Sequence, residues 1–269
     1  MSLDPGRYAL SDFVLNSGVN DVAIIIEDVS GNRQRIDFSL LTDTQLLKKG
    51  VSEYSVNVGV QRSDAASRRI EYDSDRPAWS GFVRYGVSDS LTVGLDYQGD
   101  DTLNVYGASA SIATMLGTFS GVASRSSSSQ FGKGETFIGR WTYDAVLREG
   151  ARPHRIEVAG IQRSANYMNL GQPSPQNQFK TEARARYSFP LPADAYGFVS
   201  ARQAEPIDLA SPSQSAYGAG FSKAFGRFTA AVVAEHMMGE IEDTSVQVRL
   251  SVPLGRRQNL AATYDSIPD

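Results

Sequence analysis

FKTEARARYSF, residues 179–189, alternates strictly between two kinds of side chain. One set consists of Phe, Thr, Ala, Ala, Tyr and Phe, and the other consists of Lys, Glu, Arg, Arg and Ser. A repeat of two residues places successive side chains on opposite faces of a β-strand. The stretch therefore predicts a strand with one apolar face and one charged face.

The same alternation recurs from about residue 52 to the end of the chain. In segment 245–254, Val and Leu alternate with Ser, Gln and Arg, and segments 91–98 and 136–144 show a similar division. Clusters of Gly, Asp, Ser, Asn and Pro separate these runs, as expected of turns. About thirteen strands are expected, at 52–63, 77–88, 91–100, 103–115, 117–128, 133–146, 152–166, 179–191, 193–206, 214–225, 227–238, 243–254 and 258–267.

Two features of these strands favour a membrane barrel over a soluble sheet, although both kinds of sheet can have one apolar face. The strands are long enough for a tilted span of the bilayer. Aromatic residues fall near strand ends, where an interfacial girdle would lie. These aromatic residues are Tyr85, Tyr97, Trp141, Tyr143, Tyr187 and Phe189.

Connection lengths give a third reason. The turns at 88–90, 192–194 and 255–257 are tight, whereas 67–76, 167–178 and 206–214 are long and polar. Short turns on one rim and long loops on the other are typical of outer-membrane barrels. The predicted fold class is therefore all-β, a transmembrane antiparallel β-barrel. Because bacterial single-chain barrels have even strand numbers, a set of about thirteen strands indicates a partial barrel.

Composition narrows the possible functions. The chain has 269 residues, of which 41% are hydrophobic and 21% charged, and its longest apolar runs are far too short for a membrane helix. It contains no cysteine, so disulfides and thiolate metal sites are excluded. A net charge of -4 makes nucleic acid an unexpected partner. The first residues show no secretory signal, so an exported chain is expected to begin inside a longer protein.

Residues 1–48 differ in character from the rest. Tyr8–Leu15, Val22–Asp28 and Gln34–Leu41 are candidate strands of a β-sandwich, with a tight turn at 30–32. The single expected helical turn lies at 43–49 and ends at Gly50.

The order of motifs in the first 60 residues resembles the fimbrial usher proteins of the chaperone–usher pathway. A Pro-Gly-aromatic turn is followed by a strand ending near Asp, an Asp-Val strand, an acidic strand end before a Gly turn, and a leucine-rich segment that leads into Gly-x-x-x-Tyr-Ser. Arg7-Tyr8 stands where many ushers have Pro-Phe, and Ser30-Gly31 stands where they have Asp-Gly. The residues that carry the resemblance are Pro5, Gly6, Tyr8, Asp12, Asp21, Glu27 and Gly31.

The resemblance implies a specific organisation. Residues 1–48 would be the C-terminal part of an immunoglobulin-like plug domain, and 49–269 would be part of the transmembrane barrel. The chain would belong to an outer-membrane pore that assembles and translocates pilus subunits. Its partners would be periplasmic chaperone–subunit complexes and outer-membrane lipid, with no small-molecule substrate.

The charged face of the strands would then line the pore. Mixed charge would keep the channel wet and non-adhesive for folded subunits. The predicted pore-lining residues are Arg140, Asp144, Lys180, Glu182, Arg184, Arg186, Gln247 and Arg249.

No catalytic chemistry is expected. His154 and His236 are far apart and lack metal-ligand spacing. We therefore predict no enzyme activity, no cofactor and no metal site. Two alternatives remain open at this point: another porin or transport barrel, or a soluble β-rich carbohydrate-binding protein. The soluble alternative requires the apolar faces to pack together in a dry interior.

Overall fold

The computed structural model describes residues 18–27, 33–42, 46–63, 71–147, 152–172, 174–175, 177–193, 195–226, 228–239, 242–253 and 259–266. These residues form strands and the turns between them. Among them, no helix has the length and apolar character that crossing a membrane would require.

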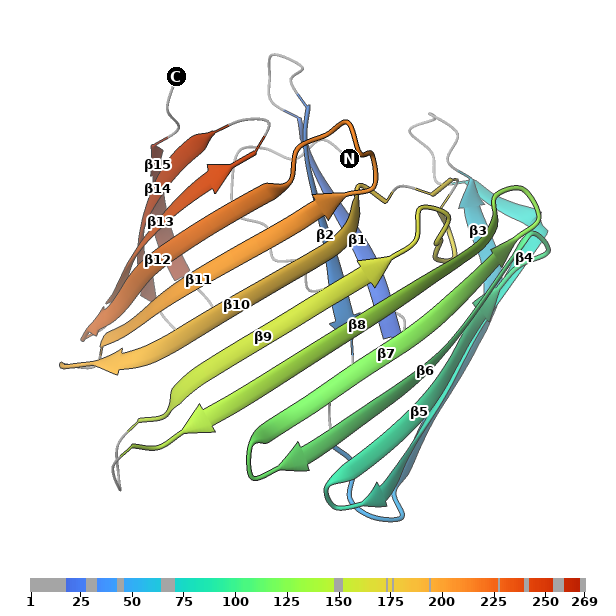
Figure 1. Cartoon of the computed structure of the whole chain (residues 1–269), viewed down its shortest axis with the longest axis horizontal. Coiled ribbons are helices and arrows are strands. Elements are labelled where there is room, and N and C mark those ends of the chain that lie inside the picture. Colours follow the sequence, from blue (N-terminus) through green and yellow to red (C-terminus); the bar gives the residue numbers. More distant parts are fainter. Residues whose placement is uncertain are drawn as a thin grey trace. The chain divides into compact units, whose positions relative to one another are not determined.

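The larger sheet contains thirteen strands in sequence order, each hydrogen-bonded to its neighbours along the chain (Figure 1). The thirteen strands and the all-β class were predicted and are confirmed. The strands are β3 (Ser52–Ser63), β4 (Glu71–Ser88), β5 (Leu91–Gly99), β6 (Leu103–Thr114), β7 (Gly117–Ser128), β8 (Gly132–Ala145), β9 (His154–Arg163), β10 (Phe179–Leu191), β11 (Ala195–Pro206), β12 (Gln214–Phe225), β13 (Phe228–Met238), β14 (Asp243–Pro253) and β15 (Asn259–Ser266).

Strand β4 begins at Glu71, earlier than the predicted start at residue 77. The register explains the difference, because it jumps from Val60↔Pro77 to Gln61↔Asp73. Proline has no N–H for the ladder, so the chain passes it in a β-bulge and then resumes pairing. The sequence signal at Pro77 therefore marks a bulge and not the end of the strand.

A second, two-stranded sheet pairs β1 (Gly18–Glu27) with β2 (Arg33–Thr42). The register from Gly18↔Thr42 to Glu27↔Arg33 is that of an antiparallel hairpin. The strands predicted at Val22–Asp28 and Gln34–Leu41 are thus confirmed. Asp21 and Glu27 lie on β1, whereas Pro5, Gly6, Tyr8, Asp12, Gly31 and the strand predicted at Tyr8–Leu15 lie outside the described residues.

The helical turn predicted before Gly50 is wrong for residues 46–50. Leu47 N donates to Thr92 Oγ1 at 2.8 Å, and Lys49 N donates to Asp89 Oδ1 at 3.0 Å. Gly50 has φ +81° and donates to the Gly86 carbonyl at 2.8 Å. Backbone donors that a helical turn would use internally are instead taken by β5, the β4–β5 turn and the end of β4.

The chain forms two compact units. Unit 1 contains Met1–Ile112, Gly121–Ile138 and Asn166–Gln176, and unit 2 contains Ala113–Ser120, Gly139–Ala165 and Asn177–Asp269. The predicted division between a plug segment at 1–48 and a barrel segment at 49–269 stays a prediction.

Candidate functional site

In unit 1, one face of the strands carries exposed apolar side chains. The register places Tyr54, Val83 and Leu95 in one row across β3, β4 and β5. Their exposed fractions are 75%, 46% and 61%. We call the sheet surface that contains this row the apolar face of unit 1; it also contains Val56, Tyr97, Tyr106 and Ile112.

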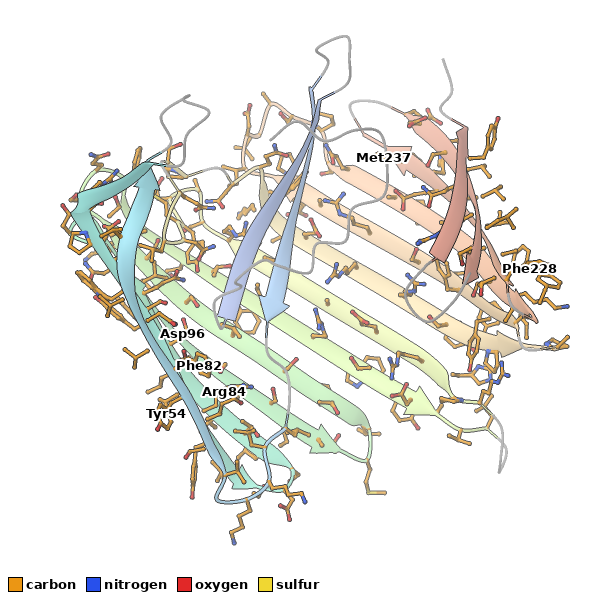
Figure 2. All side chains as sticks on the ribbon, turned by 180° about the vertical axis from the view of Figure 1, so that it is seen from behind. Tyr54, Phe82, Arg84, Asp96, Phe228 and Met237 are labelled. Atoms are coloured by element: carbon orange, nitrogen blue, oxygen red, sulfur yellow. The ribbon has the colours of Figure 1, made fainter. Side chains whose placement is uncertain are left out.

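The opposite surface, the polar face of unit 1, is the better buried one. Arg84 is 8% exposed and forms a salt bridge with Glu53 on the neighbouring strand. Tyr54, next to Glu53 in β3, therefore projects from the other side of the strand (Figure 2). Other polar side chains on this face are also buried, including Thr92, Gln98 and Ser111. Burial in unit 1 is thus reversed relative to a water-soluble sheet, in which the apolar side is the covered one.

Unit 2 shows the same division. The register aligns Phe221, Val232, Val248 and Tyr264 in one row across β12 to β15. Phe221 is 46% exposed and Tyr264 is 68% exposed. We call the surface with this row the apolar face of unit 2; it also contains Tyr187, Val199 and Tyr217.

The exposure of these two apolar faces distinguishes a sheet that contacts lipid from a sheet that contacts water. Each large apolar side chain would gain roughly 1.5–3 kcal/mol by leaving water. Contiguous exposure of this extent marks a surface that normally meets an apolar partner. The alternative of a soluble carbohydrate-binding protein requires these apolar side chains to pack together in a dry interior. That alternative is wrong, because the side chains lie on the outside of each unit.

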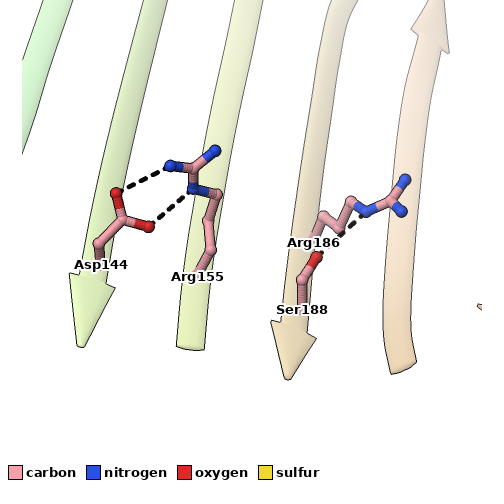
Figure 3. Close-up of polar contacts among 4 residues, drawn as sticks. All are labelled: Asp144, Arg155, Arg186 and Ser188. Carbon is pink, nitrogen blue, oxygen red and sulfur yellow. Dashed lines mark hydrogen bonds and ion pairs between the residues drawn. The ribbon is translucent and has the colours of Figure 1, made fainter. Parts of the chain in front are cut away.

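The polar face of unit 2 carries the charged side chains that the sequence predicted together. Arg155 donates to both carboxylate oxygens of Asp144, at 2.7 and 2.9 Å (Figure 3). Arg140 Nε lies 3.8 Å from Glu157 Oε1, and Glu157 is directly opposite Arg186 of β10 in the sheet register. The pairs join neighbouring strands, so the charges form a ladder across β8, β9 and β10.

The ladder continues onto later strands. Arg202 pairs with Glu182 at 2.7 Å, and Arg202 is directly opposite Arg184. Through the registers of β11 to β14, Gln247 and Arg249 lie on this same face. Seven of the eight predicted pore-lining residues therefore share one surface of unit 2. These are Arg140, Asp144, Glu182, Arg184, Arg186, Gln247 and Arg249.

Lys180 is the eighth predicted pore-lining residue. The β10–β11 register shifts between Phe179 and Thr181, which leaves Lys180 without a partner on β11. Its assignment to the pore lining rests on the alternation of β10 alone. For all eight residues, a role in lining a pore stays a prediction.

Aromatic side chains gather on the apolar face of unit 2 near the short turns. Trp141 stacks on Phe119 and on Tyr143, with ring centroids 6.2 Å apart in both pairs. The Trp141 indole Nε1 also donates to the Leu116 carbonyl in the β6–β7 turn, at 2.7 Å. Tyr187 and Phe189 form a second pair at the end of β10. This arrangement matches an interfacial aromatic belt at the short-turn rim.

Four of the six connections that the sequence singled out are confirmed in length. The long loop predicted at 67–76 is wrong from residue 71 onward, where β4 begins, and the tight turn predicted at 255–257 lies outside the described residues. The short connections at 89–90 and 192–194 join β4 to β5 and β10 to β11 at one rim. The long connections at 164–178 and 207–213 join β9 to β10 and β11 to β12 at the other rim. The connections at 100–102 and 129–131 are also short but lie at the long-loop rim, and 146–153 is longer but lies at the short-turn rim.

Both histidines lie near strand ends and bind neighbouring side chains. His154 Nδ1 and the Tyr187 hydroxyl are 2.7 Å apart, and His236 Nδ1 and Thr244 Oγ1 are 2.8 Å apart. Within the described ranges, no group of three His, Cys, Asp or Glu residues is arranged to hold a metal ion.

A feature that the sequence reasoning missed is the position of the loop after β9. Tyr167 is 1% exposed and Met168 is 3% exposed, and both pack with Leu103 and Val105 of β6. Met168 N donates to the fully buried Ser126 Oγ at 3.1 Å. Val105 is the register partner of Gln98, so this loop covers the polar face of unit 1.

Two sequence signals point to this contact. On the polar face of β6, the later positions are occupied by Gly107, Ser109 and Ser111. The first two positions of the same face are the apolar residues Leu103 and Val105, which indicates that another segment covers them. Gly134 leaves room for the loop, because a Cβ there would lie 2.2 Å from Tyr167 N. We call residues 164–172 the wall-contacting loop.

Comparison with known proteins adds a family match over almost the entire chain. The model of the outer membrane usher protein family matches residues 2–267. The outer membrane usher protein PefC of Salmonella typhimurium strain LT2 is 34% identical over 90 residues, which is 33% of this chain and 11% of PefC.

Two solved structures have a similar fold. The PapC-containing P pilus tip assembly intermediate PapC–PapD–PapK–PapG of E. coli, in its second conformation, matches with a TM-score of 0.61 and 13% identity over 93% of this chain. The translocation pore of the P pilus usher PapC matches with a TM-score of 0.56 and 14% identity, also over 93% of this chain. This chain spans 32% and 52% of the two solved chains.

Proposed function

This chain belongs to the outer membrane usher protein family, and on that basis we propose that it forms part of a pore that assembles pilus subunits and moves them across the outer membrane. The resemblance seen in the first 60 residues is confirmed by the family match, as is the location in the bacterial outer membrane. One observation carries the proposal: the strands expose their apolar face and hold a ladder of charged pairs on the other face.

The proposed pore wall is the polar face. Arg140, Asp144, Lys180, Glu182, Arg184, Arg186, Gln247 and Arg249 would meet water and the passing subunit. Alternating charges on neighbouring strands satisfy one another, as in the Asp144–Arg155 pair. Such a wall stays hydrated and offers few apolar contacts to a folded protein. This supports passage of folded subunits without adhesion.

Residues 1–48 are proposed as part of the plug domain. The hairpin of β1 and β2 supports this, because these strands form a sheet of their own and pair with no strand of the larger sheet in the described residues. We propose that the plug fills the pore until a periplasmic chaperone–subunit complex engages. The proposed activity is positioning and passage of subunits, with no bond-making chemistry and no cofactor.

The proposal predicts the phenotype of deleting the gene. Chaperone–subunit complexes should accumulate in the periplasm, and pili should disappear from the cell surface. The measurement is electron microscopy of pili together with blotting of periplasmic subunits, with the gene restored on a plasmid as control. Normal pili in the deletion strain, accompanied by reduced solute uptake, would favour the alternative of a general transport barrel.

A further inference from the structure

The polar face of unit 2 contains a cluster of three arginines. Glu157 on β9 is directly opposite Arg186, but the guanidinium that it approaches is that of Arg140, with 3.8 Å between Arg140 Nε and Glu157 Oε1. Arg184 on β10 lies directly opposite Arg202 on β11, and Arg186 follows two residues later. Arg202 is bound by Glu182 at 2.7 Å. Within the described part of the chain, no carboxylate lies within 4.0 Å of the Arg184 or Arg186 guanidinium. Like charges directly opposite each other destabilise a sheet, so the Arg184–Arg202 pair has a cost that the Glu182–Arg202 salt bridge offsets in part.

Arg186 is held in a defined orientation. Its guanidinium carbon lies 3.7 Å from the centroid of the Phe198 ring, on the neighbouring strand β11. Arg186 Nε also contacts Ser188 Oγ at 3.4 Å, and the side chain extends from β10 towards β11 (Figure 3). Stacking on an aromatic face orients a guanidinium and removes part of its water shell. Little further ordering is needed for this group to bind an anion.

On the far side of β11 from the arginine cluster, the polar face of β12 carries two glycines. On β12 the register places Gly218 opposite Ser200 and Gly220 opposite Phe198. A Cβ on Gly218 would meet Ser200 Oγ at 2.7 Å, and a Cβ on Gly220 would meet the Val232 carbonyl at 2.6 Å. These close approaches favour glycine at both positions. The Phe198 ring, whose Cε1 lies 2.7 Å from the Gly220 Cβ position, packs against β12 where a larger residue would displace it from under Arg186.

We propose that Arg184 and Arg186, with Phe198 as the support for Arg186, form a docking surface for an acidic patch on the protein that passes through the pore. Guanidinium groups bind carboxylates in a planar, two-point geometry. Because the cluster is on the face opposite the apolar one, its partner is a protein in the aqueous passage and not a lipid. This inference rests on the proposed function, since it requires that face to line a pore.

The test uses the usher as its gene encodes it, reconstituted in planar lipid bilayers, with a periplasmic chaperone–subunit complex added so that the proposed plug leaves the pore. The probe is a ten-residue polyglutamate peptide added to the bath, with polylysine of equal length for comparison. Polyglutamate should block the channel current, and the double substitution R184Q/R186Q should raise the blocking concentration about tenfold. The control is Lys133→Gln, which removes an exposed positive charge from the side of β8 that also carries Phe137 and should leave the blocking concentration unchanged.

The outcomes separate the two proposals. A bilayer without channels for any variant, even with the chaperone–subunit complex present, contradicts the proposed pore, whereas a channel whose block is unchanged in R184Q/R186Q overturns the docking surface alone. Because Arg184 is one of a like-charged pair, its replacement should not hinder folding. Should R184Q/R186Q nevertheless fail to insert, R184K/R186K keeps the charge and removes the planar geometry. Its blocking concentration should then rise about threefold, and an unchanged value counts against the inference.

Discussion

Replacing Val248 with arginine should cost about 2 to 4 kcal/mol of stability in the membrane. Val248 is near the middle of β14, between Val232 and Tyr264 in the apolar row of unit 2. In the proposed barrel that row faces lipid, so a guanidinium there has no water and no counter-ion within reach. The measurement is denaturant unfolding of the protein folded into lipid vesicles, combined with the amount recovered from the outer membrane.

The matched control is Gln247→Arg, one residue earlier on the same strand. Gln247 lies on the polar face, opposite Val233 of β13, and it is exposed. We expect this substitution to change stability by less than about 0.5 kcal/mol. Equal costs at the two positions, or a larger cost at Gln247, would mean that the apolar and polar faces have been assigned to the wrong environments.

The division into two faces could be predicted from the sequence, because the two-residue repeat of a strand depends only on neighbouring residues along the chain. Ser245, Gln247, Arg249 and Ser251 alternate with Val and Leu, and no tertiary information is needed to place them on one side. Strand number followed from the same pattern, since each run ends at a cluster of turn residues. Which of the two faces is exposed did not follow from alternation alone, because a soluble sheet has the same period.

Contacts between segments distant in sequence could not be predicted in this way. Phe198 supports Arg186 only because the β10–β11 register brings the two residues together. The early start of β4 depends on a bulge opposite Gln61, whereas the sequence shows only a proline. The residues 46–50 have a helix-like composition, yet their N–H groups are taken by Thr92, Asp89 and Gly86. In each case a partner far along the chain overrides the local preference.

The wall-contacting loop gives the second large expected effect. In Gly134→Ala, the added Cβ would lie 2.2 Å from Tyr167 N and 2.3 Å from Tyr167 Cα. These are backbone atoms, so no side-chain rotation can relieve the overlap, and overpacking of this kind costs about 1–3 kcal/mol. The loop should then leave the polar face of unit 1 part of the time.

The chemical accessibility of residue 168 measures how often the loop leaves the polar face of unit 1. The chain contains no cysteine, so Met168→Cys introduces the only thiol within these 269 residues, at a position that is 3% exposed. Adding Gly134→Ala to this variant should speed maleimide labelling at residue 168 by roughly 5- to 150-fold. Mass spectrometry of the labelled peptide gives the rate.

Gly121→Ala is the control, because its Cβ would come no closer than 3.5 Å to the Ile138 carbonyl. Labelling at residue 168 should stay at the slow rate in that variant, since an ordinary contact leaves the loop in place. Fast labelling without any substitution at Gly134 would show that Tyr167 and Met168 are not held against β6. The polar face near Leu103 and Val105 would then be open to water, and the passage beside it wider than this loop allows.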